Sequence, residues 1–137
     1  MNAIFTVMGE PVGKARPRVT KFGHAYTPEK TVLYENLVKL EYERQCGAEK
    51  IQKPNMVALN VTAYFGIPSS ASKKKRKEML CGYTRPTKKP DCDNIFKTVA
   101  DALNGLAYDD DSQVVSASIE KYYSENPRLE ITVESIE

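Results

Sequence analysis

Apolar and polar residues alternate along several stretches of the chain in ways that predict strands. Residues 3–8 form an apolar run expected to be a buried strand, and residues 22–26 a short strand or hairpin arm. Residues 56–65 and 128–134 alternate apolar and polar side chains, as half-buried strands do. Residues 113–122 are expected to form one more strand. The short connection Ser124–Pro127 then predicts that the last two strands pair as a hairpin.

Three other segments have helical character. The longest is expected to run from Pro28 to Cys46, with Thr27 as its N-cap and Gly47 as its stop. Its stripe would consist of Leu33, Leu37, Leu40 and Arg44. A short basic helix is expected at about 72–80. A third begins near Asp93 and ends at Asn104–Gly105, with an apolar stripe of Ile95, Val99, Ala102 and Leu103.

The order of these elements predicts the fold class. Strands and helices are mixed without repeats, and no linker is long enough to divide the 137 residues. We therefore expect a single small α+β domain over residues 1–137, in which helices pack on a mixed or antiparallel sheet.

Composition narrows the setting in which the protein works. No stretch has the length of about 18 apolar residues that a membrane span needs, and no basic region followed by an apolar run marks a secretory signal. The cysteines, Cys46, Cys81 and Cys92, form no C-x-x-C pair and are odd in number. These features predict free thiols, a cytoplasmic location and no membrane partner.

Charge is strongly segregated although the net charge is only +2. Residues 73–89 contain eight lysines and arginines against Glu78 alone, whereas residues 91–111 contain six aspartates against Lys97 alone. A solvated surface ordinarily mixes the two signs. The separation therefore indicates that each block has its own electrostatic task.

The acidic block contains a candidate metal site. Pro90 restricts Lys89 to extended backbone, and residues two apart in an extended stretch point the same way, so Asp91 and Asp93 are expected to enter one pocket. Paired carboxylates suit Mg²⁺, which prefers oxygen ligands. The alternative is helix capping, with Asp93 as the N-cap and Asp91 complementing the helix dipole. The acids at 109–111 would then form a solvated turn.

Spacing leaves two interpretations of Lys97, which lies four residues after Asp93 and four before Asp101. An exposed series of ion pairs, worth a few tenths of a kcal/mol each, is favoured by the spacing alone. The other interpretation is a fixed cation that stabilises charge developing in a transition state.

Asp111 can reach the level of Asp91, because the third helix rises roughly 16 Å and the six residues after it span at most about 20 Å.

Four stretches resemble signatures of the RusA family of Holliday junction resolvases. Asp91–Lys97 resembles the family's D-x-D-N-x-x-K signature, and Asp101–Gly105 resembles the helix end that follows it. Asp110–Val114 resembles the D-D-x-Q-V signature. Gly9–Arg18, with Tyr26–Pro28 after it, resembles the N-terminal motif of one large branch of the family. The resemblance covers nearly the whole chain.

The resemblance implies a RusA-like fold and a metal-dependent crossover junction endodeoxyribonuclease that nicks four-way junctions in pairs, in DNA recombination and repair. By the motif matches, Asp91, Asp93 and Asp111 correspond to the family's catalytic, metal-binding carboxylates, and Lys97 to its catalytic lysine. The implied cofactor is Mg²⁺, with Mn²⁺ as a substitute. Asp110 is a neighbour in the same motif, and Asp109 is an acid that the pattern does not demand.

Binding of branched DNA is expected from basic residues near the acidic block and in the N-terminal motif, namely Lys14, Arg16, Arg18, Arg85, Lys88 and Lys89. For the run Lys73–Lys77 a solvated helix face is as good an explanation. A homodimer is expected from the family and from the two-fold symmetry of a four-way junction. Two other classes remain open: a non-catalytic branched-DNA-binding protein and another Mg²⁺-dependent phosphohydrolase.

Overall fold

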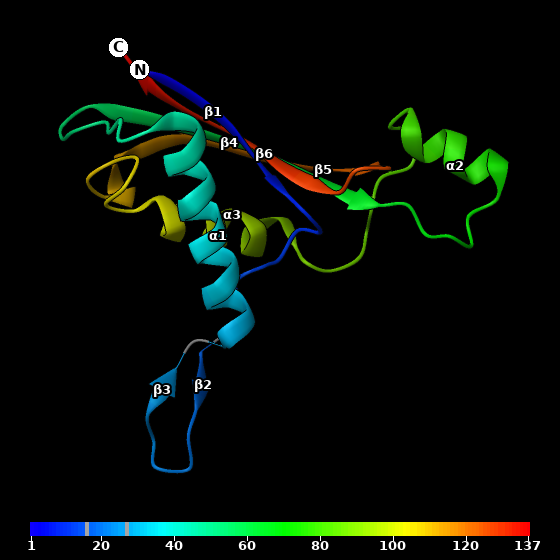
Figure 1. Cartoon of the computed structure of the whole chain (residues 1–137), viewed down its shortest axis with the longest axis horizontal. Helices are drawn as coiled ribbons and strands as arrows, with labels where there is room; N and C mark the ends of the chain where they lie inside the picture. The colour runs from blue at the N-terminus through cyan, green and yellow to red at the C-terminus, as the bar shows by residue number, and fades with distance from the viewer. Residues whose placement is uncertain (16, 27) are drawn as a thin grey trace.

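Four strands assemble into one mixed sheet, and its core residues come from β1, β4 and β6. The computed structural model describes residues 1–15, 17–26 and 28–137. The strands are β1 (Asn2–Met8), β4 (Met56–Gly66), β5 (Val114–Ser124) and β6 (Arg128–Ile136), arranged in the order β1-β6-β4-β5. β6 runs antiparallel to both β1 and β4, while β5 runs parallel to β4. Helices α1 and α3 pack on this sheet (Figure 1), so the expected α+β class with a mixed sheet is confirmed.

The expected hairpin between the last two strands is wrong. β5 and β6 do not pair with each other, because β4 lies between them and pairs with both. The connection 125–127 instead passes over the end of β4 at Gly66. A Cβ at Gly66 would lie 3.3 Å from Cγ of Pro127 and closer still to Oε1 of Glu10, so a glycine at this position leaves room for the crossing and for the Glu10 side chain.

Helix α1 (Glu29–Cys46) has the expected length but packs with a different face. Its buried residues are Thr31, Tyr34, Val38 and Tyr42. The stripe predicted to be buried is wrong: Leu33 and Leu40 are each 60% exposed and Leu37 is 37% exposed. Both stripes have helical spacing. The stripe with the tyrosines packs on the sheet, where the Tyr42 ring stacks on Phe5 of β1 with a distance of 5.4 Å between the ring centroids. Gly47 ends the helix with φ 72°, as expected, and Thr27 lies outside the described residues.

Helix α3 (Cys92–Leu103) is the element that carries the acidic motif. Its predicted stripe is confirmed, since Ile95, Val99, Ala102 and Leu103 are fully buried. Gly105, with φ +79°, follows the C-cap Asn104 as the sequence predicts. The hydroxyl of the buried Tyr108 donates to the Ala100 carbonyl at 2.7 Å. These contacts fix the helix on the sheet and thereby fix the side chains on its exposed face.

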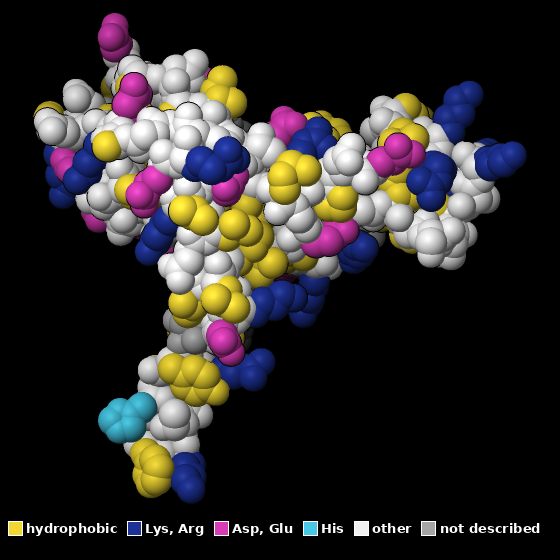
Figure 2. Space-filling view, viewed as in Figure 1, with side chains coloured by type: hydrophobic (Ala, Val, Ile, Leu, Met, Phe, Trp, Pro, Cys, Tyr) yellow, Lys and Arg dark blue, Asp and Glu magenta, His cyan; other side chains and the backbone are white. Residues whose placement is uncertain are grey.

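Two basic elements extend away from the sheet (Figure 1). Helix α2 (Lys73–Leu80) is capped by Ser72, whose Oγ accepts the Lys75 N–H, and it buries none of its residues. Strands β2 (Arg18–Val19) and β3 (Ala25–Tyr26) pair antiparallel and form an arm beyond the N-terminal end of α1. Figure 2 shows His24, the only histidine, on the surface of this arm. The predicted arm is therefore confirmed.

Strand β1 is buried on one face only. Ala3, Phe5 and Val7 belong to the core, whereas Ile4 and Met8 are 65% and 59% exposed on the opposite face. The expectation of a fully buried first strand thus holds for alternate residues.

Within the described residues no helix is long and apolar enough to cross a membrane. All three cysteines have free thiols, as predicted.

Candidate active site

The start of α3 decides where the first two acids point. Asp91 is the N-cap residue and has extended backbone, with φ −73° and ψ 156°, and its side chain makes no capping hydrogen bond. Asp93 already lies in the first helical turn. The expectation that Asp91 and Asp93 share one direction along extended backbone is wrong, because residues two apart in a helix do not face each other. The alternative with Asp93 as the N-cap is also wrong, because the helix begins at Cys92 and Asp91 occupies the N-cap position.

Asp93, Lys97 and Asp111 border one pocket between α3 and β5. The pocket has a volume of about 640 Å³. Asp111 begins the short 3-10 helix Asp111–Gln113 that leads into β5, so the loop after α3 does return to the start of the helix within one chain. The remaining lining is mostly apolar or small: Cys92, Phe96, Ala100, Val114, Ala117, Ser118 and Ile119. An acidic pair beside a lysine therefore lies at an open, water-accessible groove.

Asp91 borders a second pocket, of about 450 Å³, on the other side of the α3 N-terminus. Its lining includes four cationic side chains, namely Lys14, Arg18, Lys30 and Lys89. Within the part of the chain that the structure describes, no three His, Cys, Asp or Glu side chains come close enough to hold a metal together. One chain thus supplies the pair Asp93 and Asp111, with Asp91 in the adjoining pocket.

The three consecutive aspartates after α3 have different surroundings. Asp109 accepts the Lys53 N–H at 2.8 Å and pairs with the Lys50 ammonium at 2.9 Å, and these contacts lower its pKa. Asp110 caps the 3-10 helix through Ser112, whose hydroxyl and N–H lower the pKa of the Asp110 carboxyl. Asp109 and Asp110 therefore hold the loop in shape. Asp111 is the acid of the triple that borders the pocket.

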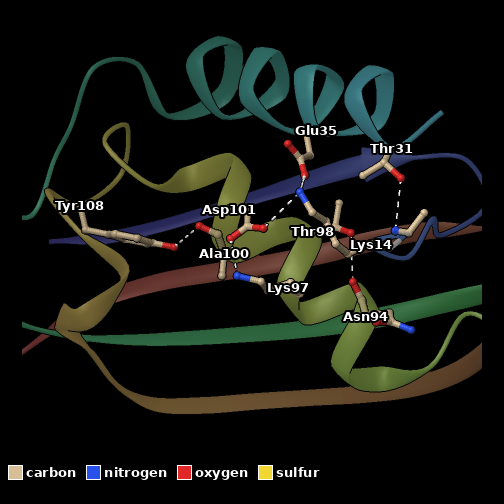
Figure 3. Close-up of polar contacts among 10 residues, drawn as sticks. Lys14, Thr31, Glu35, Asn94, Lys97, Thr98, Ala100, Asp101 and Tyr108 are labelled. Carbon is tan, nitrogen blue, oxygen red and sulfur yellow. Dashed lines mark hydrogen bonds and ion pairs between the residues drawn. The ribbon is translucent and has the colours of Figure 1, made fainter. Parts of the chain in front are cut away.

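Lys97 belongs to a line of four alternating charges, shown in Figure 3. Its ammonium donates to Oδ1 of Asp101 at 3.0 Å. The Lys14 ammonium lies 3.3 Å from Oδ2 of Asp101 and donates to Oε1 of Glu35 at 2.5 Å. Burial by itself would lower the pKa of Lys14, but Glu35 and Asp101 outweigh burial and raise it. Lys14 is therefore a charged link between α1 and α3.

The segment Gly9–Lys14 forms a strap that ties α3 to the sheet. Oε1 of Glu10 accepts the Gly66 N–H at 2.9 Å, at the end of β4. Gly13 packs against the start of α3, and the Lys14 N–H donates to the Asn94 carbonyl at 2.9 Å. The sequence indicated that Lys14 contacts DNA, but its ammonium here is bound to two carboxylates. Arg16 lies outside the described residues.

The other predicted DNA-binding residues lie at two places. Arg18 and Lys89 border the pocket of Asp91. Arg85 and Lys88 lie farther along the sheet, where Arg85 Nε donates to the Lys121 carbonyl at 2.7 Å and its guanidinium lies 4.1 Å above the Tyr122 ring. All four side chains belong to exposed residues. The sequence did not single out Lys30 or Glu35, because nothing in the spacing of α1 indicates that this helix borders the site.

The chain belongs to the RusA endodeoxyribonuclease family, whose model, described as "Endodeoxyribonuclease RusA", matches residues 8–134. The RusA-type resemblance of the motifs is thereby confirmed. A curated relative is the "Uncharacterized protein YqaN" of Bacillus subtilis (strain 168), which is 42% identical. The match covers 96% of this chain and 95% of that protein.

Proposed function

We propose that the protein is a Mg²⁺-dependent, homodimeric endonuclease that resolves four-way DNA junctions by paired nicks in recombination and repair. The observation that carries the proposal is the meeting of Asp93, Asp111 and Lys97 in one pocket, with Asp91 on the other side of the same helix end. Membership of a family of endodeoxyribonucleases supports phosphodiester hydrolysis as the reaction.

The residues at this site fit a hard divalent cation. Mg²⁺ is ordinarily bound by one or two carboxylates, keeps several waters and contacts substrate phosphate, so a carboxylate pair at an open groove matches its needs. Asp93 and Asp111 would hold the ion, Asp91 would complete the acidic set, and Mn²⁺ would substitute. When bound, such an ion lowers the pKa of a water and polarises phosphoryl oxygens.

The side chains beside the acids would orient the DNA and stabilise charge. Lys97 borders the acidic pocket, where its ammonium would attract the negative charge that builds up on the phosphoryl oxygens. The buried stripe of α3 fixes the backbone from which Lys97 extends toward this pocket. The histidine is on the arm, and no role in proton transfer is assigned to it.

Basic residues around the pocket of Asp91 would bind the DNA backbone. Arg18 and Lys89 border this pocket, and the arm from Arg18 to Tyr26 contains no acid. Arg85 and Lys88 would extend the contact along the sheet. Contacts of this kind with phosphate give affinity without reading sequence. Arg16 remains a candidate from its sequence, whereas the Lys14 ammonium is bound to Glu35 and Asp101.

The exposed face of α1 supports a dimer built from two copies of that helix. Leu33, Leu37 and Leu40 form an apolar stripe that a single chain leaves in water. If two copies pair antiparallel with Leu33 of one against Leu40 of the other, Glu29 of one copy lies level with Arg44 of the other, and both lie beside the stripe. A two-fold arrangement makes this opposite-charge contact twice. The charges beside the apolar stripe therefore favour pairing with a second copy.

A cutting assay on a synthetic four-way junction tests the proposed activity. We expect symmetric paired nicks with Mg²⁺, none with chelator, and retained binding without cutting for Asp91→Asn, Asp93→Asn and Asp111→Asn. Asp109→Asn is the matched control and should cut. Binding that is equal with and without Mg²⁺ and never leads to a nick would instead indicate a non-catalytic branched-DNA-binding protein. Turnover of free nucleotides would indicate another phosphohydrolase.

A further inference from the structure

An exposed lysine–aspartate pair on a helix is ordinarily weak, because two long side chains must be ordered for a small gain in water. Lys97 and Asp101 would be such a pair if nothing else held Asp101. The Lys97 side chain is 58% exposed, whereas that of Asp101 is 22% exposed. The difference indicates that Asp101 is the fixed partner.

Asp101 is held from a second side by Lys14. Lys97 contacts one carboxylate oxygen and Lys14 the other, so each oxygen has its own cation. Lys14 is itself bound to Glu35 of α1, and its side chain is only 22% exposed (Figure 3). The charges of Glu35, Lys14, Asp101 and Lys97 therefore alternate in sign from α1 through the strap to the pocket.

The backbone around Lys14 is anchored as well as its side chain. The Lys14 N–H donates to Asn94 at the start of α3, and the Ala15 N–H donates to Oγ1 of the buried Thr31 at 3.3 Å. These bonds join the strap to both helices. Because Lys14 is held in place, Asp101 has few alternative rotamers while it is paired with Lys14. Asp101 in turn restricts the position of the Lys97 ammonium.

We propose that Lys14, Asp101 and Glu35 are positioning residues that hold the Lys97 ammonium at the pocket of Asp93 and Asp111. This inference rests on the proposed function. Lys14 and Lys97 both pair with the single negative charge of Asp101. Asp101 therefore neutralises Lys97 only in part, and the Lys97 ammonium can still attract phosphate. Without Lys14, Asp101 would act as the full counter-ion of Lys97 and draw it away from the substrate.

Single-turnover cutting of a four-way junction by saturating protein separates this role from binding and folding. Lys14→Met and Asp101→Asn should each slow the cutting step by about tenfold or more, as misplacement of a reacting group does. The Kd for the junction should change by less than about twofold, because neither side chain is assigned to DNA. Thermal unfolding of each variant verifies that it is folded, and Glu35→Gln, farthest along the line, provides a milder variant.

The cutting rate of a double variant, compared with the rates of the single variants, distinguishes the positioning role from a purely structural one. The double variant Lys14→Met/Asp101→Asn should cut no more slowly than the slower single variant, since both changes remove the same restraint. Lys14→Arg, which keeps the charge, should recover part of the rate. Glu130→Gln is the control, because it removes the 3.0 Å ion pair to Arg128 without touching either pocket.

Several results would overturn the inference. Rate losses that multiply in the double variant would mean independent roles, and a loss confined to Kd would mean DNA contact. If wild-type protein cuts the junction and Lys14→Met cuts as fast, the positioning role fails while the proposed function stands. If wild-type protein does not cut with Mg²⁺, the proposed function itself fails.

Discussion

Gly13 lies against Pro90 so closely that a Cβ on Gly13 would come within 2.7 Å of the Pro90 Cβ and 3.0 Å of the Asn94 Cβ. Pro90 and Asn94 flank Asp91 and Asp93 at the start of α3. The absence of a side chain at Gly13 therefore sets how closely the strap approaches the acids.

Gly13→Ala should displace the start of α3 and reduce junction cutting by about tenfold or more while the protein remains folded, because positional errors near 1 Å can cost that much. Cutting rate and thermal melting measured together would check this. Gly47→Ala is the control: its φ of 72° and ψ of −142° make alanine unfavourable by about 1–3 kcal/mol, but nothing lies within 4 Å of the added atom. Cutting by Gly13→Ala at the wild-type rate would contradict the expectation.

Substitution of Asp109 should lower stability, whereas substitution of Asp111 should abolish activity. The contacts with Lys53 and Lys50 lower the pKa of Asp109 below its ordinary value of 3.8. A carboxyl with a lowered folded-state pKa stabilises the fold above its ordinary pKa and loses that contribution as pH falls through the lowered value. Asp109→Asn should therefore lower Tm at pH 7, and the difference from wild type should close in acid below about pH 3.8.

Asp111→Asn should show the opposite behaviour, with no junction cutting and a Tm close to that of wild type. Thermal unfolding across pH and cutting at neutral pH measure both properties on the same samples. A stability difference for Asp109→Asn that persists unchanged into acid would show that its carboxylate contacts do not stabilise the loop.

Lys89 should contribute to junction affinity through phosphate rather than through sequence. Lys89→Ala is expected to weaken binding equally for junctions of different sequence and to reduce the slope of log K against log salt by about 0.9, the value for one lost phosphate contact. Lys53→Ala, which removes a cation that borders neither pocket, should leave the slope unchanged. Titrations by fluorescence anisotropy at several salt concentrations would measure this.

The self-complementary face of α1 should respond to charge reversal. Glu29→Lys and Arg44→Glu should each weaken the dimer by placing like charges opposite each other, and the double variant should restore it. Sedimentation equilibrium would measure the association. Leu37→Glu should produce monomers, because it puts a charge in the middle of the stripe. A dimer that is indifferent to all of these changes would require another interface.

Helix α1 also shows what hydrophobic pattern alone fails to decide. The sequence predicted the limits of the helix but selected the stripe of Leu33, Leu37 and Leu40 as the buried face. The stripe of Tyr34, Val38 and Tyr42 packs on the sheet instead. Two apolar faces on one helix satisfy the same period, and only the shape of the facing sheet distinguishes them.

The site was predicted in part, for a similar reason. The sequence correctly predicted that Asp111 returns to the start of α3, because the loop after the helix is long enough. It failed for the relation of Asp91 to Asp93, which depends on the residue at which the helix begins. It also missed Glu35, since a long-range ion pair between α1 and the strap has no local signature. The insertion of β4 between β5 and β6 was equally invisible, because it depends on pairing across the whole chain.

The pairing of β1 with β6 has a consequence for biosynthesis. Asn2 pairs with Glu134, and β6 also supplies an antiparallel neighbour for β4. On the ribosome, β1 lacks its paired neighbour until β6 has left the exit tunnel. The four-stranded sheet is therefore complete only once residues 128–136 have emerged. Such dependence on distant contacts is typical of slow folding, and it leaves the nascent chain exposed to chaperones and proteases in the meantime.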